Sequence, residues 1–326
     1  MPDVFLTGGT GFVGGALLRR LAAEGRAVRA LARTPAGQEL VRFLGAEAVA
    51  GDLADGAALQ RGMAGCRVVF HAAGVNAMCL PDPAPMYRVN VDGAAGVVQA
   101  AAAAGVPRVV HTSSAVTMGE VAGVVATEAT AHRGSYLSQY ERSKHLGEQA
   151  VLAEGRRTGV EVVCVSPSSV QGPGRTGGTA RLLIGYLSGR LRWTVDATFS
   201  LVFVNGCTRA HLLAERRGVA GERYLVSGAT LTVREAVALL GQLAGMERKV
   251  RHLPGWAAVA GATVVGGAYG LAGRQAPVCR EMARVLRHGA AYDGSKATRE
   301  LGLEYTPLEE WLRATVAWYR AEGLVG

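Results

Sequence analysis

Short apolar runs alternate with longer amphipathic stretches through the first half of the chain. The runs have the length of buried strands and predict Val4–Thr7, Ala27–Ala32, Ala48–Ala50, Val68–His71, Val109–Thr112 and Val160–Val165. The stretches between them predict helices at Gly14–Glu24, Gln38–Leu44, Asp55–Met63, Val89–Ala104 and Tyr140–Arg156. Strands that alternate with helices of this length are typical of a parallel sheet covered on both faces. The pattern therefore predicts an α/β fold with a doubly wound parallel sheet.

The alternation loosens after Val165, where a loop rich in Pro and Gly follows. A pair of strands is predicted at Leu201–Val204 and Tyr224–Val226, and we expect the chain to return to the main sheet there. Helices are then predicted to begin near Val233, Trp256, Glu281 and Glu309. We therefore predict a first domain over 1–165 and a smaller, mostly helical lobe over 166–326.

The segment Leu253–Gly273 carries no charged residue and is long enough to cross a bilayer. It is dominated by Gly, Ala and Val, and such small residues give weak insertion energy. We expect a buried or cleft-lining helix and no integral membrane span.

Composition narrows the classes of function. The chain has 35 Lys and Arg against 26 Asp and Glu, a net charge of +9, and 49% hydrophobic residues. These values indicate a globular protein whose basic surface attracts a polyanionic cofactor. The basic residues are scattered and no recognition motif accompanies them, so we expect no nucleic-acid partner.

The cysteines and the first residues of the chain indicate the cellular compartment of the protein. The five cysteines are Cys66, Cys79, Cys164, Cys207 and Cys279, with no C-x-x-C spacing. An odd, widely spaced set predicts reduced, mostly buried thiols and no metal site. The chain goes straight into a strand, without the pattern of a signal peptide. A cytoplasmic location is therefore predicted.

The stretch Thr7–Gly14, T-G-G-T-G-F-V-G, joins the first strand to the first helix. Glycines in such a turn let the backbone bend sharply, approach a pyrophosphate and pack the helix on the sheet. The N–H groups at the helix start then bind the phosphates. The turn predicts a dinucleotide site at this edge of the sheet.

A candidate for proton transfer lies further along the chain. Tyr140 and Lys144 stand four residues apart and share one face of the predicted helix. An ammonium beside a phenol favours the phenolate and is expected to lower the pKa of Tyr140. Ser113 and Ser114 end a strand at the edge where ligands bind, and either hydroxyl could hydrogen-bond a reacting oxygen.

Taken together, these motifs resemble the extended short-chain dehydrogenase/reductase family, in its NAD-dependent epimerase/dehydratase group. The resemblance spans nearly the whole chain. The matching segments are Thr7–Gly14, Asp52-Leu53, His71–Gly74, Asn90–Gly93, Ser114, Tyr140, Lys144, Pro167–Gly174 and Asp293–Gly302. It implies a Rossmann sheet with a C-terminal substrate lobe.

The resemblance also implies residue roles. Tyr140 is the general acid/base, Lys144 lowers its pKa and binds the nicotinamide ribose, and Ser114, in preference to Ser113, orients the substrate carbonyl. Hydride passes between the nicotinamide and the substrate carbon. The implied cofactor-binding residues are Gly8, Thr10, Gly11, Phe12, Val13, Arg33, Asp52, Leu53, Ala72, Ala73, Gly74, Lys144, Pro167 and Val170.

The end of the second strand bears on the choice of cofactor. Arg33 and Thr34 stand where an acidic residue would bind the 2′-hydroxyl of NAD. A guanidinium there suits a 2′-phosphate. NADP(H) is therefore the predicted cofactor, with NAD(H) possible.

Two segments depart from the family. Relatives often carry an acidic pair where this chain has Asn205-Gly206, so lobe packing or substrate shape is expected to differ. The Arg that usually precedes the Pro of the later loop is replaced by Ser166, which leaves the expected activity intact.

Three functions fit these residues. The first is an NADP(H)-dependent reductase of ketones or aldehydes, similar to dihydroflavonol-reductase-like and hydroxysteroid-dehydrogenase-like members. The second is a nucleotide-sugar epimerase or dehydratase with tightly bound NAD, for which Arg175, Arg181 and Arg192 could grip a diphosphate and Glu120 is the acidic residue nearest in sequence after Ser114. The third is a dinucleotide sensor without turnover. The resemblance further implies a homodimer formed through the helices that carry Asn90 and Tyr140.

Overall fold

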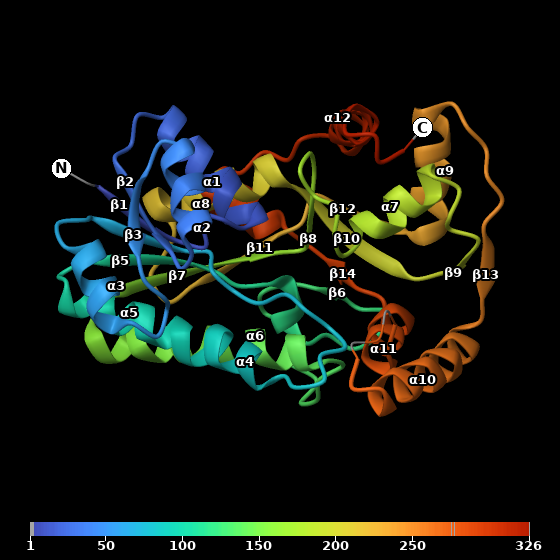
Figure 1. Cartoon of the computed structure of the whole chain (residues 1–326), viewed down its shortest axis with the longest axis horizontal. Helices are drawn as coiled ribbons and strands as arrows, with labels where there is room; N and C mark the ends of the chain where they lie inside the picture. The colour runs from blue at the N-terminus through green and yellow to red at the C-terminus, as the bar shows by residue number, and fades with distance from the viewer. Residues whose placement is uncertain (1–2, 275, 277, 326) are drawn as a thin grey trace.

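The computed structural model of the chain describes residues 3–274, 276 and 278–325. Its centre is a seven-stranded parallel sheet with the order β11-β7-β5-β4-β1-β2-β3 (Figure 1). These strands are β1 Val4–Thr7, β2 Val28–Ala32, β3 Glu47–Ala50, β4 Val68–His71, β5 Arg108–Thr112, β7 Glu161–Pro167 and β11 Arg223–Val226. The predicted doubly wound sheet is confirmed, and each of the six strands expected in the first half is present.

Helices cover both faces of this sheet. They are α1 Phe12–Ala23, α2 Pro35–Phe43 and α8 Val204–Arg217 on one face, and α3 Gly56–Met63, α5 Ala94–Ala103 and α6 Gln139–Thr158 on the other. Successive strand residues feed the two cores alternately: Val4 and Leu6 pack toward α1, whereas Phe5 packs toward α3. Burial on both faces is why the strands are continuously apolar.

The remaining elements form a second, smaller region and its connections. The helices are α4 Ala84–Tyr87, α7 Ala180–Leu187, α9 Val233–Ala244, α10 Gly255–Leu271, α11 Arg280–His288 and α12 Leu308–Ala321. The strands are β6 Val125–Ala126, β8 Ser169–Gln171, β9 Trp193–Val195, β10 Thr198–Phe203, β12 Ala229–Thr232, β13 Arg251–Leu253 and β14 Ala291–Tyr292. Leu183, Leu240 and Trp311 belong to a core that joins α7, α9 and α12.

The two strands predicted as a pair lie in different sheets. β11 pairs with β7 in the main sheet, as the return of the chain near Tyr224 required. β10 instead pairs with β8 and β12 in a separate three-stranded sheet, so the expected return of 201–204 to the main sheet is wrong. The reason is α8, which leaves the end of β10 and packs on α1 and the main sheet before the chain reaches β11. The division at residue 165 stays a prediction.

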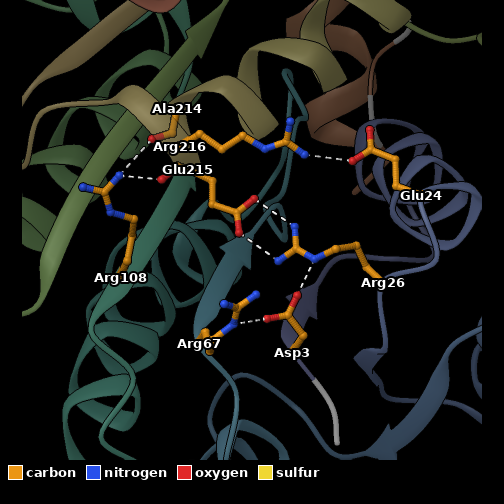
Figure 2. Close-up of polar contacts among 8 residues, drawn as sticks. All are labelled: Asp3, Glu24, Arg26, Arg67, Arg108, Ala214, Glu215 and Arg216. Atoms are coloured by element: carbon orange, nitrogen blue, oxygen red, sulfur yellow. Dashed lines mark hydrogen bonds and ion pairs between the residues drawn. The ribbon is translucent and has the colours of Figure 1, made fainter.

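An ion-pair network fixes α8 to the amino-terminal edge of the sheet (Figure 2). The Arg26 guanidinium lies between two carboxylates: it donates to Asp3 and, over 2.8 and 3.0 Å, to Glu215 of α8. Arg108 donates to the backbone carbonyl of Glu215 over 2.6 Å. Arg67 forms a second ion pair with the same Asp3 carboxylate. Residues just before β1, β2 and β4, and the first residue of β5, are thereby held to α8.

Helix α10 differs from the prediction in its burial. Within this helix only Ala262 is buried, whereas Trp256, Val264 and Leu271 are 72%, 73% and 95% exposed. The expectation of a buried or cleft-lining helix is therefore wrong. The small residues pack closely on one neighbour, α11, and leave the other side of the helix uncovered. Across the described parts of the chain, no helix combines the length and apolarity that a bilayer crossing requires.

Two of the cysteines are paired. Cys79 and Cys279 form a disulfide between residues 200 positions apart in the sequence, with Cα atoms 5.6 Å apart. Cys66, Cys164 and Cys207 are free and buried, as predicted. The expectation of reduced thiols throughout is thus wrong for one pair, because sequence spacing does not show which distant residues the fold brings together.

Candidate active site

The glycine-rich turn is shaped by close backbone contacts. Gly8 has a φ of +78°, and a Cβ there would lie 2.5 Å from the backbone nitrogen of Ala73. A Cβ on Gly14 would lie 2.1 Å from the carbonyl oxygen of Gly8. Side chains are excluded from both positions, so the backbone at the start of α1 stays open. Such a cradle fits the pyrophosphate of a dinucleotide.

Hydrogen bonds connect the end of β1 to the end of β4 beside this turn. The Thr7 hydroxyl lies 2.6 Å from Nδ1 of His71, and it accepts a hydrogen bond from the backbone N–H of Ala73 over 3.3 Å. The Ala72 N–H donates to the carbonyl of Thr7. Ala72 and Ala73 are therefore held against the glycine-rich turn, at the carboxyl edge where ligands of such sheets bind.

The position expected to meet the adenosine ribose is formed by β2, β3 and α2. The Arg33 guanidinium lies 3.7 Å from the Asp52 carboxylate, and both side chains are largely open to solvent. Thr34 caps α2 by accepting a hydrogen bond from the Gly37 N–H over 3.1 Å. The Thr10 methyl group lies 3.3 Å from the place of a Cβ on Gly37. The start of α2 thus faces the glycine-rich turn beside Arg33.

The Ser, Tyr and Lys predicted for proton transfer come together at the ends of β5 and α6. The Ser114 hydroxyl lies close enough to the Tyr140 phenol to act on its pKa. Lys144 is buried and donates from Nζ to the carbonyl of Thr112 over 2.9 Å. The same Nζ lies 3.9 Å from the place of a Cβ on Gly74. Lys144, which shares a helix face with Tyr140, therefore stands beside the Ala72–Gly74 segment that borders the glycine-rich turn.

Burial controls the protonation of this group. It lowers the pKa of Lys144 to about 8, against the opposing field of Glu148. It raises the pKa of Tyr140, an effect that the hydrogen bond from Ser114 and the charge of Arg175 oppose. The direction for Tyr140 is opposite to the lowering predicted from sequence, because loss of solvent disfavours the phenolate more than the nearby groups favour it. Both shifts favour the neutral forms.

Glu148 is a buried residue of this site that the sequence analysis missed. It lies one helical turn after Lys144 on α6 and accepts hydrogen bonds from Ser113 over 2.5 Å and Ser166 over 3.2 Å. Arg223 of β11 forms an ion pair with it at 3.3 Å. The two serines therefore divide their roles: Ser113 is bound to Glu148, and Ser114 contacts Tyr140. The i, i+4, i+8 spacing of Tyr140, Lys144 and Glu148 is the sequence signal that could have found it.

Asn90 holds the next part of the site in place. Its side chain accepts a hydrogen bond from the Val75 N–H over 2.8 Å and donates to the Val75 carbonyl over 2.9 Å. The same amide donates to the Ser143 hydroxyl of α6 over 2.9 Å. The loop after β4 is thus fixed against the helix that carries Tyr140 and Lys144.

Arg175 comes from the Pro- and Gly-rich loop and closes the site from the opposite side. Its guanidinium lies 5.4 Å from the centre of the Phe12 ring, and its Nε is buried without a hydrogen-bond partner. A cleft of about 630 Å³ opens next to the glycine-rich turn, lined by Thr10–Phe12, Pro173-Gly174 and the start of α8. Asn205 contributes to this cleft and accepts a hydrogen bond from Arg20 of α1 over 2.6 Å.

Four other residues expected to bind the cofactor come from different parts of the fold. Val13 is in the first turn of α1, Leu53 packs against the Gly93 backbone, Pro167 ends β7, and Val170 is in β8. In the described residues no group of three or more His, Cys, Asp and Glu side chains is arranged to hold a metal ion.

Comparison with known proteins gives a consistent match. The sequence model of the NAD dependent epimerase/dehydratase family matches residues 4–227. The chain is 30% identical to sterol demethylase protein B of Methylococcus capsulatus, over 98% of this chain and 99% of that protein. It is 32% identical, over 91% of this chain and 90% of the other, to 4-hydroxy-2-methyl-3-oxo-4-farnesyl-3,4-dihydroquinoline-1-oxide ketoreductase of Stigmatella aurantiaca. The crystal structure of gox2253 superposes with a TM-score of 0.85 at 28% identity, covering 100% of both chains.

Proposed function

The chain belongs to the NAD dependent epimerase/dehydratase family, an NAD(P)-binding family of enzymes, and from that premise we propose that it reduces an apolar ketone or aldehyde with NADPH. The observation that carries the proposal is the meeting of Ser114, Tyr140 and Lys144 beside the Ala72–Gly74 segment. A substrate oxygen bound between Ser114 and Tyr140 would receive its proton there. The reverse reaction would oxidise the alcohol.

The residues fit a dinucleotide, which when bound supplies a hydride from nicotinamide C4 to the carbonyl carbon. Ser114 donates a hydrogen bond to the substrate oxygen as negative charge develops on it. The Tyr140 phenol, neutral because burial raises its pKa, gives its proton to that oxygen. Lys144 in its charged form then stabilises the phenolate that remains.

The preference for NADPH rests on the surroundings of Arg33. Its side chain is exposed and forms a long ion pair with Asp52, at 3.7 Å, so the guanidinium stays accessible to a second anion. At the capped start of α2 the Ala36 N–H points to the same place, because Pro35 has no N–H and the Gly37 N–H is bound by Thr34. A 2′-phosphate would be held by the guanidinium and by this helix terminus together.

The names of two relatives support an apolar substrate, and the contacts of the acidic residues argue against a dehydratase. One relative is a ketoreductase whose name gives a farnesylated oxo compound, and another is named for sterol demethylation. For a dehydratase, an acidic residue that can act near Ser114 is expected. Glu148 is near but is already bound by Ser113, Ser166 and Arg223. The carboxyl of Glu120 instead accepts a hydrogen bond from Tyr292 over 3.3 Å and lies 3.9 Å from His288.

A substrate panel tests the proposal. Purified protein is incubated with NADPH and apolar ketones, aldehydes or nucleotide sugars, while absorbance and products are followed. We expect NADPH consumption with one or more apolar carbonyl compounds. Conversion of a nucleotide sugar without net NADPH consumption would favour the epimerase or dehydratase instead.

A further inference from the structure

Helix α10 has two different long faces. The face formed by Gly255, Ala258, Val259, Ala262, Val265 and Gly266 is partly or fully buried. The opposite face, here called the outer stripe, consists of Trp256, Ala260, Thr263, Val264, Gly267 and Leu271, all of them exposed. The Thr263 hydroxyl donates within the helix to the Val259 carbonyl over 2.7 Å, so it adds little polarity. An outward helix face is normally polar, and this one is apolar along its whole length.

The structure holds this face away from the body of the protein. α11 lies between α10 and the rest of the chain, and α10 runs along the edge of the molecule (Figure 1). A Cβ on Gly266 would lie 3.5 Å from Cα of Cys279, the residue before α11 that is bonded to Cys79. The Glu281 carboxylate of α11 accepts hydrogen bonds from the Gln139 N–H over 3.0 Å and the Cys79 N–H over 3.5 Å. These contacts anchor α11, and α10 packs on it through the face opposite to the outer stripe.

Positive charge is concentrated in the segment that carries the outer stripe. Residues 247–287 hold seven Lys or Arg and two Glu, a net charge of +5 out of +9 for the whole chain. All seven basic side chains are exposed: Arg248, Lys249, Arg251, Arg274, Arg280, Arg284 and Arg287. Arg251 and Arg274 flank the two ends of α10, and the last three form a stripe on α11. Of the two acidic residues, Glu281 is already bound by the contacts described above.

We propose that the outer stripe of α10 docks on the surface of an anionic lipid bilayer. An apolar helix face between arginines matches such a surface, where the apolar side chains enter the boundary of the acyl region and the cations meet lipid phosphates. Trp256 is a side-chain type that favours this depth. The helix lies on the membrane and does not cross it. The proposal goes beyond the reductase activity and does not depend on it.

Charge also distinguishes a bilayer from a second copy of this chain. A symmetric dimer through α10 would bring two surfaces of net charge +5 against each other. Like charges in an interface oppose association, whereas the same charges are attracted by anionic lipid. The membrane surface is therefore the occupant that complements both the apolar and the charged residues.

Co-sedimentation of the full chain with vesicles tests the proposal. One vesicle contains phosphatidylcholine alone and the other phosphatidylcholine with phosphatidylglycerol. We expect binding to the second at least about tenfold tighter than to the first, weakening as salt rises. The double substitution Val264→Asp and Leu271→Asp is expected to weaken this binding more than about tenfold. Val219→Asp is the control, because Val219 is 57% exposed and lies outside α10 and α11, and binding of this variant should not change.

Three outcomes would overturn the proposal. The first is absence of binding to either vesicle. The second is binding that the Val264→Asp, Leu271→Asp variant retains. The third is a dimer in sedimentation velocity that the same variant converts to a monomer, which would assign the stripe to a second copy. Because the substituted side chains are exposed, melting temperatures of the variants should stay near that of the wild type and show that the fold is intact.

Discussion

Lys144 donates a hydrogen bond from its buried Nζ to the backbone carbonyl of Thr112, over 2.9 Å. This contact fixes α6 to the end of β5, and therefore fixes Tyr140 relative to Ser114. The ammonium has lost most of its solvent and has one backbone acceptor in return. Its protonation is consequently sensitive to pH within the range in which enzymes are assayed.

The pH dependence of turnover should report on Lys144. Burial lowers its pKa to about 8, so the ammonium is charged below that pH and neutral above it. Under the proposed mechanism the charged form supports proton transfer, so kcat/KM for ketone reduction should fall as pH rises through about 8. Lys144→Arg keeps a charge at all these pH values. Its residual activity should lack this decline, and a decline of the same midpoint in the variant would assign it to another group.

Substitution of Arg33 tests the choice of cofactor. The wild-type melting temperature should rise more with NADPH than with NADH. Arg33→Ala removes a charged donor to the 2′-phosphate and should weaken NADPH binding about tenfold while leaving NADH binding unchanged. Arg42→Ala, an exposed arginine in the last turn of α2, is the control. Equal effects on the two dinucleotides would remove the argument for NADPH.

Gly14→Ala should damage the dinucleotide site more than its small size suggests. The added Cβ would lie 2.1 Å from the Gly8 carbonyl oxygen, so the turn or α1 must move. We expect at least tenfold weaker NADPH binding in a calorimetric titration, and a loss of about 1–3 kcal/mol in the free energy of unfolding. Gly56→Ala serves as the control, because a Cβ there meets nothing within 4 Å. Unchanged affinity in Gly14→Ala would contradict the assigned cradle.

The network in Figure 2 predicts where stability is lost. The Arg26 and Glu215 side chains are only 16% and 15% exposed, so Arg26→Ala leaves poorly solvated carboxylates behind. We expect a loss of about 2–3 kcal/mol in urea unfolding. Arg157→Ala breaks an exposed ion pair with Glu154 and should cost about 0–1 kcal/mol. Similar losses in the two variants would show that burial of the Arg26 pair is unimportant.

The same network predicts how the stability of the fold changes as pH falls. Hydrogen bonds from Arg67, and then from Arg26, hold the pKa of Asp3 below its ordinary value of 3.8. A carboxyl with a lowered pKa stabilises the fold above its unfolded-state value, and this stabilisation is lost as pH falls. The difference in stability between wild type and Arg26→Ala should therefore shrink below pH 4.

The order of apolar and polar residues along the chain predicted the strands of the main sheet. It could not predict contacts between segments that are distant in the sequence. The strands of the first half are buried on both faces, so their apolar runs stand out, and the motif at Tyr140 and Lys144 follows from helical spacing alone. The pairing of β10, the Cys79–Cys279 bond and the partners of Glu148 depend on residues far apart in sequence. The burial of α10 was misjudged because its small, apolar residues predict a packed helix, whereas only one face meets a neighbour.

The role of Tyr140 is the central claim, and one comparison tests it most directly. Tyr140→Phe removes only the phenolic oxygen, so NADPH should bind within about twofold of the wild type in a fluorescence titration. Ketone reduction under saturating NADPH should fall by about 10²- to 10⁴-fold, the usual contribution of a general acid. Turnover by Tyr140→Phe at the wild-type rate, with intact cofactor binding, would contradict the account.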